Sequence, residues 1–231
     1  MWWALVVAAV VGYLIGSIQV GLLVGRAARG VDIRDYGSGA TGAANVIRTA
    51  GPKAGIFVVF ADIAKGLVPV YLGFGFGHLA GVESGDARAW IAAAAGFAAV
   101  CGHVWPLYAQ FRGGKAVASG FGGALAMNPA AAAAVVPLAA VVIASVRITS
   151  VMSITMAPLI AVVFIVLAAL GVSPWAYAAW GAATATLIVW RHRGNIRRLL
   201  AGTEPKIGKG GERRADAATG LSDLGGRPGA A

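Results

Sequence analysis

The sequence predicts an all-α membrane protein, a polytopic bundle of about seven transmembrane helices. Of its 231 residues, 58% are hydrophobic and only 12% are charged, about half the charged fraction of an ordinary soluble domain. A hydrocarbon core of ~30 Å is crossed by about 20 helical residues. Uncharged stretches of that length recur along the chain, at 2–25, 89–111, 116–146 and 148–190.

The predicted helices follow from where the uncharged stretches begin and end. We expect them at 2–24, 55–76, 89–108, 115–127, 130–146, 153–171 and 174–190. The first has no basic residue before it and is too long for a signal peptide, which indicates a retained span. Helix-breaking residues at Asn128-Pro129 and at 171–174 mark two of the turns.

The segment 115–127 allows a second interpretation. It is short and contains Gly120, Gly122 and Gly123. It could therefore be one arm of a re-entrant hairpin with 130–146. That arrangement would leave five full spans, and each end of the chain would stay on the same side of the membrane as with seven.

The basic residues predict the orientation in the membrane. Of 19 Lys and Arg residues, 17 fall in the loops and the tail on one side, whereas Arg88 alone falls in an opposite loop. Cytoplasmic loops carry the excess of Lys and Arg. We therefore expect an outside N-terminus and a cytoplasmic C-terminus. This distribution also accounts for the net charge of +10 without a nucleic-acid partner.

The composition divides the chain into two parts. Residues 1–204 form the predicted membrane domain. The tail, 205–231, is rich in glycine and charge and lacks apolar periodicity, which predicts a disordered cytoplasmic segment without chemistry of its own. The single cysteine, Cys101, excludes a disulfide within the chain and lies in an apolar segment where a nucleophilic thiol is not expected.

Residues 36–51, YGSGATGAANVIRTAG, form a glycine-rich loop between two apolar runs. The loop combines small hydroxyl side chains with Asn45 and Arg48 and contains no acidic residue. Glycine lets a backbone approach a ligand closely, and successive free N–H groups bind anions. The pattern favours a phosphate-binding loop, with a flexible connector as the alternative.

The sequence RGGK at 112–115 points to the same chemistry. Gly113 and Gly114 leave backbone N–H groups free, and Lys115 opens the next predicted helix, whose amino-terminal end attracts anions. The glycine spacing differs from that of a P-loop. The alternative is an ordinary membrane-edge loop with snorkelling basic side chains.

Two more polar clusters fall on the predicted cytoplasmic side. One is 146–153, with Ser150 and Ser153, and the other is 190–204, with His192 and Asn195 among arginines. Like-charge repulsion should lower the pKa of His192 and keep it neutral. No cysteine or carboxylate lies near His192 in the sequence, so no metal site is expected, and no G-x-S-x-G nucleophile elbow is present. The second span also contains Asp62 and Lys65, which can form an i,i+3 ion pair.

Six motifs in sequence order carry a family resemblance. They are GSIQVGLLVGR, GVDIRDYGSG with NVIRTAG, DIAKG, GHVWP, FRGGKAVAS and RHRGNIRRLLAGTE. Across about 12–204 the chain resembles the bacterial membrane acyl-phosphate:glycerol-3-phosphate acyltransferases. The resemblance implies transfer of a fatty acyl group from acyl phosphate to the 1-hydroxyl of glycerol 3-phosphate, giving lysophosphatidic acid.

The resemblance also implies the setting of the reaction. No cofactor, metal or covalent acyl-enzyme is expected, because the substrate's own phosphate assists deprotonation of the attacking hydroxyl. The expected partners are the two substrates, membrane lipid and a soluble acyl-phosphate synthase. The expected location is the bacterial cell (inner) membrane, with the active site facing the cytoplasm.

The family's site residues transfer to matching positions. The expected catalytic residues are Ser38, Arg48, Lys115, His192 and Asn195. The expected substrate-binding residues are Gly39, Thr41, Gly42, Asn45, Gly113, Gly114, Ser150 and Ser153.

The chain departs from the family's usual pattern at Ala40 and Ala44, which replace Asn and Thr, and at Gly194, which replaces a common acidic residue. Thr41 offers a compensating hydroxyl. These departures leave a low-activity paralogue as an alternative. A scaffold that recruits lipid enzymes through its basic tail is another. An organic-anion transporter is a third, although the chain has no internal repeat.

Overall fold

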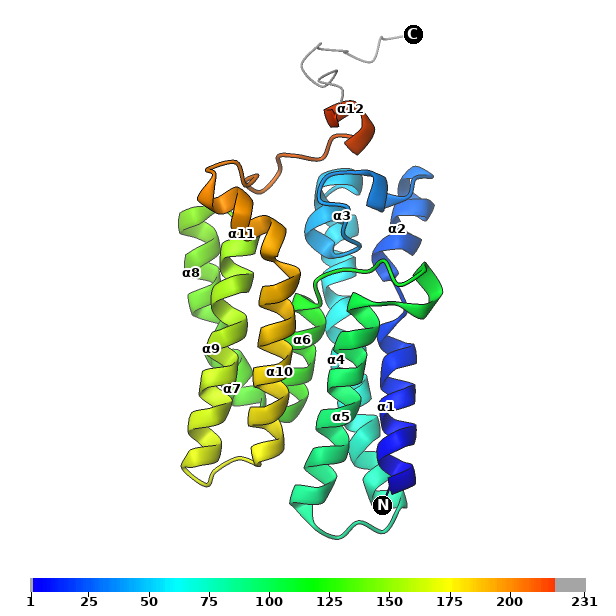
Figure 1. The fold of residues 1–231 in the computed structure, drawn as a ribbon, viewed down its shortest axis with the longest axis vertical. Coiled ribbons are helices and arrows are strands. Elements are labelled where there is room, and N and C mark those ends of the chain that lie inside the picture. Colours follow the sequence, from blue (N-terminus) through cyan, green and yellow to red (C-terminus); the bar gives the residue numbers. More distant parts are fainter. Residues whose placement is uncertain (1, 219–231) are drawn as a thin grey trace.

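The computed structural model describes residues 2–218, and all regular elements among them are helices (Figure 1). In chain order they are α1 (Trp2–Gly16), α2 (Val20–Arg29), η1 (Ile33–Asp35), α3 (Ala43–Ala50), α4 (Pro52–Leu79), α5 (Gly85–Val104), η2 (Leu107–Ala109), α6 (Val117–Met127), α7 (Pro129–Ala134), α8 (Val136–Val146), α9 (Thr149–Ala169), α10 (Trp175–Arg191), α11 (Arg193–Leu200) and α12 (Arg214–Ala218). The elements labelled η are single 3₁₀ turns.

Five helical segments of the described chain are long and apolar enough to cross a membrane. They are Trp2–Arg29, Pro52–Leu79, Gly85–Ala109, Pro129–Val146 and Thr149–Ala169. The helix α6 has 11 residues and reaches only about 16 Å, which is too short for a full span. The predicted count of seven spans is therefore not confirmed, although every predicted segment is helical.

Two of the predicted spans are interrupted. The first continues from α1 into α2 after a break at residues 17–19, and 130–146 divides into α7 and α8 at Val135. Pro137 lies in the first turn of α8, where a missing backbone N–H costs little. The helix α6 is short and is followed directly by the turn into α7. Its length is consistent with the re-entrant interpretation of the segment 115–127.

Glycines let the helices pack at backbone distance. A Cβ atom on Gly66 of α4 would collide with the backbone of Ser119, and one on Gly122 of α6 would collide with Ile63. Gly12 on α1 packs in the same way against Ala95 of α5. Small residues at helix crossings maximise van der Waals contact, which drives helix association where lipid removes the hydrophobic effect.

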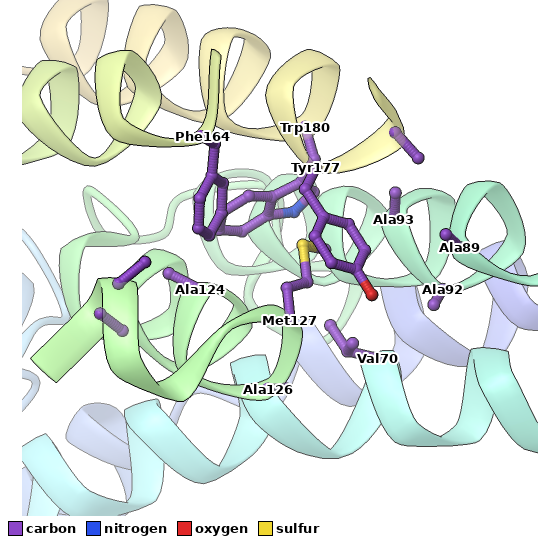
Figure 2. Packing of buried hydrophobic residues seen from close by; sticks show 13 residues of the cluster. Val70, Ala89, Ala92, Ala93, Ala124, Ala126, Met127, Phe164, Tyr177 and Trp180 are labelled. Carbon is purple, nitrogen blue, oxygen red and sulfur yellow. The ribbon is translucent and has the colours of Figure 1, made fainter. Parts of the chain in front are cut away.

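An aromatic cluster joins α9 and α10 to the remaining helices (Figure 2). The ring of Phe164 lies 6.1 Å, between centroids, from both Tyr177 and Trp180. Met127 of α6 and Val70 of α4 complete the buried contact. This packing holds α9 and α10 against α4 and α6, and it thereby holds the loops at the end of these helices in place. Figure 1 shows α2, α3, α11 and α12 together at that end, opposite the start of α1.

Candidate functional site

Two cavities meet at the end of the bundle that carries α3 and α11. The larger, about 410 Å³, runs between α4, α6, α8, α9 and α10 and is lined mostly by apolar side chains. We call it the apolar cavity. The smaller, about 260 Å³, is lined by Lys115 and four arginines of residues 191–198, and we call it the basic cavity. Ser38, Ala40 and Lys115 line both cavities.

Asn45 organises the loop that forms one wall of this junction. Its Nδ2 donates to the carbonyl oxygens of Ile33 (2.8 Å), Tyr36 (3.1 Å) and Ala40 (3.0 Å), and its Oδ1 accepts the backbone N–H of Ser38 at 3.1 Å. These contacts use both polar atoms of the side chain. Asn45 thus holds the loop and also lines the apolar cavity, and its expected contact with substrate stays a prediction.

The loop needs glycine at two positions. Gly37 has φ +50° and Gly39 has φ +69°, which side chains rarely adopt. Gly39 lines the basic cavity, and Gly42, at the start of α3, lines the apolar cavity. Both glycines therefore lie at a cavity wall, and their role in substrate binding stays a prediction.

Thr41 anchors the loop to the first membrane segment through a side-chain hydrogen bond. Its hydroxyl donates to Oε1 of Gln19 at 2.5 Å, and both side chains are buried. Gln19 lies in the break between α1 and α2, so this bond ties the break to the loop. Thr41 lines neither cavity. Gln19 was absent from the predicted site, although it lies in the motif GSIQVGLLVGR, which contributes to the family resemblance.

A carboxylate-centred network joins three predicted site residues. Lys115 Nζ donates to Asn195 Oδ1 at 2.6 Å, and Asn195 Nδ2 donates to Glu204 Oε1 at 2.5 Å. The same oxygen accepts from Ser150 Oγ at 2.7 Å, while Arg198 Nε donates to Oε2 at 2.8 Å. The side chain of Glu204 is only 4% exposed. Asn195 is thereby oriented with its oxygen toward Lys115.

Glu204 is the main residue that the sequence interpretation missed. Burial raises the pKa of its carboxyl group, but hydrogen bonds from Asn195, Ser150 and Arg198 outweigh burial, and the net pKa is lowered. The carboxylate is thus charged at neutral pH. A signal was present, because Glu204 is the only acidic residue between Trp190 and Gly211.

Burial lowers the pKa of Lys115 to about 8. The charge of Glu204 opposes this shift, whereas the positive charges of Arg198, Arg48 and Arg191 add to it. Lys115 therefore remains mostly protonated at pH 7 and can bind an anion.

His192 stays neutral, as predicted, although burial contributes more than repulsion by its neighbours. Burial lowers its pKa to about 4, with Lys115 as the next cause. Nδ1 lies 2.7 Å from the carbonyl oxygen of Ile188. A carbonyl only accepts, so Nδ1 carries the proton and Nε2 keeps a free lone pair. His192 lines the apolar cavity, where it can accept a hydrogen bond.

The glycine pair before Lys115 has a packing role. A Cβ atom on Gly113 or Gly114 would collide with His103 at the end of α5. The N–H of Gly114 donates to the His103 carbonyl at 3.1 Å, and its own carbonyl accepts from Arg191 Nε at 3.2 Å. Gly113 lines the basic cavity, and Gly114 lines neither cavity. The helix α6 begins only at Val117, two residues after Lys115.

The remaining predicted residues differ in their placement. Ser150 and Ser153 both line the apolar cavity, and the Ser153 hydroxyl donates to the Thr149 carbonyl at 2.9 Å. Arg48 lines neither cavity, and its Nη2 donates to the Pro205 carbonyl at 3.5 Å. The structure thus brings Ser38, Lys115, His192, Asn195 and Ser150 together, and Arg48 lies near enough for its charge to act on Lys115.

The predicted ion pair between Asp62 and Lys65 is present, and Asp62 lines the apolar cavity. Lys65 Nζ lies 2.9 Å from Asp62 Oδ1 and also donates to the Ile18 carbonyl at 2.9 Å. Within residues 2–218, no group of three or more His, Cys, Asp or Glu side chains is arranged to hold a metal ion.

The chain is similar to proteins of one enzyme family. A sequence model described as glycerol-3-phosphate acyltransferase matches residues 6–202. A glycerol-3-phosphate acyltransferase of Gloeobacter violaceus is 44% identical over 85% of this chain and 91% of its own length, and one of Synechococcus is 40% identical over 87% and 94%.

Solved structures agree. The crystal structure of PlsY (YgiH), an integral membrane glycerol 3-phosphate acyltransferase, in its glycerol 3-phosphate form superposes with a TM-score of 0.76 at 33% identity, over 87% of this chain and 94% of that one. The lysophosphatidic acid form of the same protein gives a TM-score of 0.73 at 32% identity.

Proposed function

The chain belongs to the glycerol-3-phosphate acyltransferase family, and from that premise we propose how its site acylates glycerol 3-phosphate to lysophosphatidic acid. The observation that carries the proposal is the junction of the two cavities at Ser38, Ala40 and Lys115. One substrate is a small phosphate ester, and the other brings a fatty chain. A basic cavity that opens into an apolar one matches this pair.

The proposed donor is acyl phosphate, with its chain in the apolar cavity and its carbonyl at the junction. Glycerol 3-phosphate lies in the basic cavity with its phosphate among the arginines. The 1-hydroxyl oxygen attacks the carbonyl carbon, the bond from that carbon to the phosphate oxygen breaks, and the departing phosphate takes the hydroxyl proton. The phosphate is a good leaving group, so positioning and charge stabilisation supply the catalysis.

The side chains at the junction support direct transfer. His192 Nε2 can accept a hydrogen bond from the attacking hydroxyl, but its pKa of about 4 makes it a weak base. The Ser150 hydroxyl donates to Glu204, whose carboxylate already binds Asn195 and Arg198. A serine nucleophile needs an adjacent base that is free to take its proton. We therefore propose that no acyl-enzyme forms.

We propose that the protein lies in a bacterial inner membrane and that this site faces the cytoplasm. The support for this orientation is the gathering of basic loops at the end of the bundle that carries α11 and α12 (Figure 1). Cysteines introduced by Leu200→Cys and Ser84→Cys, in a Cys101→Ser background, test it. An impermeant maleimide added to intact cells should label residue 84 and not residue 200. The opposite pattern would place the site outside.

The chemistry is tested with purified protein in detergent. Radiolabelled glycerol 3-phosphate should yield lysophosphatidic acid with palmitoyl phosphate and none with palmitoyl-CoA. Product formed only from palmitoyl-CoA would refute the proposed donor. A soluble acyl-phosphate synthase remains the proposed partner, because acyl phosphate must reach a site at the end of the bundle. Co-purification from membranes would test that contact.

A further inference from the structure

The segment that follows Glu204, residues 205–214, crosses the end of the bundle from α11 to α12 above α3 (Figure 1). We call it the C-terminal strap. It lies beyond residues 6–202, which match the family. We propose that the strap is a positioning element for the phosphate substrate, holding the loop 36–40 in place and bringing Arg214 to the rim of the basic cavity.

The strap is bonded to three separate parts of the bundle. The N–H of Ile207 donates to the carbonyl of Arg147, between α8 and α9, at 2.8 Å. The Pro205 carbonyl accepts from Arg48 of α3 at 3.5 Å. Further along, the N–H of Gly37 donates to the Glu212 carbonyl at 3.0 Å. These contacts fix the path of the strap over its whole length.

The strap pairs with the substrate loop as a short antiparallel bridge. Tyr36 and Arg213 face each other in this bridge. Asn45 holds the same loop from within the bundle, so the loop is bonded on two sides. Ser38 and Gly39, which line the basic cavity, directly follow the bridged residues. A loop fixed in this way presents its backbone to a substrate without a further ordering cost.

Glycines occur on both surfaces where the strap meets the bundle. A Cβ on Gly37 would lie 2.8 Å from the Gly210 carbonyl oxygen, and a Cβ on Gly211 would lie 2.7 Å from the carbonyl oxygen of Arg48. A Cβ on Gly39 would collide with the guanidinium group of Arg214. The close backbone approaches at Gly37 and Gly211 require glycine, whereas Gly39 meets the flexible end of the Arg214 side chain.

The strap adds positive charge beside an anion site. It carries four cations, Lys206, Lys209, Arg213 and Arg214, and one anion, Glu212. The guanidinium group of Arg214 packs against Gly39, a wall residue of the basic cavity. A phosphate in that cavity would therefore be attracted by Arg214 in addition to Lys115 and the arginines of α11.

Two cysteines test the geometry independently of activity. Residues opposed in an antiparallel pair lie within disulfide range. In a Cys101→Ser background, the double variant Tyr36→Cys/Arg213→Cys should form a disulfide under mild oxidation. The matched pair Tyr36→Cys/Lys209→Cys should not. Absence of the first disulfide, or equal formation of both, would overturn the placement of the strap.

Two shortened chains test the effect on catalysis. A chain ending at residue 218 should match the full-length protein. A chain ending at residue 209, which keeps Glu204 and the Ile207 contact, should raise KM for glycerol 3-phosphate about fivefold, with kcat and KM for palmitoyl phosphate within twofold. An unchanged KM would overturn the proposal. A lower KM or a higher kcat would overturn it as well, because it would identify the strap as an inhibitory lid.

Single substitutions separate charge from backbone pairing. Arg214→Ala should raise KM for glycerol 3-phosphate about threefold, whereas Arg213→Ala, which keeps the bridge backbone, should change it less than 1.5-fold. Equal effects would refute the role of Arg214.

The identity of the substrate rests on the proposed function. If the full-length protein shows no acyl transfer, that function fails, and binding of glycerol 3-phosphate by calorimetry to the two shortened chains then decides the strap.

Discussion

Replacement of Lys115 is the most direct test of the site. Lys115 lines both cavities and donates to Asn195 Oδ1 at 2.6 Å. Arg112, three residues earlier, is exposed and lines neither cavity. Lys115→Ala therefore removes a cation from the junction, while Arg112→Ala removes one from the surrounding surface.

The expected loss follows from the strength of one charge-assisted contact. Hydrogen bonds to charged groups contribute about 1.5–3 kcal/mol, and each 1.4 kcal/mol is about tenfold. Lys115→Ala should thus lower kcat/KM for glycerol 3-phosphate about 10- to 150-fold. Arg112→Ala should lower it less than about threefold, as expected for an exposed charge. Lys115→Arg should also lose activity, because a planar fork fits poorly beside the closely packed glycines.

The pKa of Lys115, about 8, adds a second signature. The ammonium group loses its proton as pH rises through this value, so kcat/KM should be level from about pH 6.5 to 7.5 and fall toward tenfold per pH unit above 8. Lys115→Arg keeps its charge and should abolish this decline, although its activity at pH 7 is lower. Hydrolysis of acyl phosphate without enzyme must be subtracted at each pH.

Two results would refute this reasoning. Equal and mild losses in Lys115→Ala and Arg112→Ala, at matched protein yield, would mean that RGGK is only a basic surface. An unchanged decline above pH 8 in Lys115→Arg would assign the titration to another group.

Three further substitutions test other parts of the structure. Glu204→Gln removes the charge that raises the pKa of Lys115, so the alkaline decline should move to lower pH, and an unmoved decline would contradict the network. Ala157→Phe fills the apolar cavity and should lower kcat/KM for palmitoyl relative to decanoyl phosphate about fivefold; an unchanged ratio would exclude the chain from this cavity. Gly122→Leu should destabilise the α4–α6 contact by about 1–3 kcal/mol in thermal unfolding, whereas Gly75→Ala, which meets open space, should not, and equal stabilities would contradict the close packing.

Much of the architecture was predictable because it depends on local composition. Apolar length gave the helical segments, and the three-residue spacing of Asp62 and Lys65 gave their ion pair. The number of full spans was less predictable. The uncharged stretch 116–146 contains three short helices, α6, α7 and α8, and hydropathy alone does not reveal how many of them cross the membrane.

The chemistry of the site was predictable in its residues and less so in their roles. Glycines, hydroxyls and cations around 36–51 and 112–115 indicated phosphate binding, and the two cavities lie there. However, Asn45 uses its polar atoms on the loop, and Gly114 is a glycine because His103 lies against it. Both roles depend on tertiary neighbours. Composition shows that a residue can bind phosphate and not whether the fold already uses that capacity.

The C-terminal strap shows the limit of composition most clearly. Its glycines and charges are typical of a disordered segment, and on that basis 205–231 was predicted to be disordered. Residues 205–214 make specific backbone contacts, while 219–231 lie outside the described residues, so disorder of the tail stays a prediction. A strap lying on a surface needs no apolar face, because backbone hydrogen bonds and close glycine contacts hold it. The need for glycine at 37 and 211 becomes clear only from the tertiary contacts, because a Cβ there would meet the backbone carbonyl oxygen of Gly210 or of Arg48.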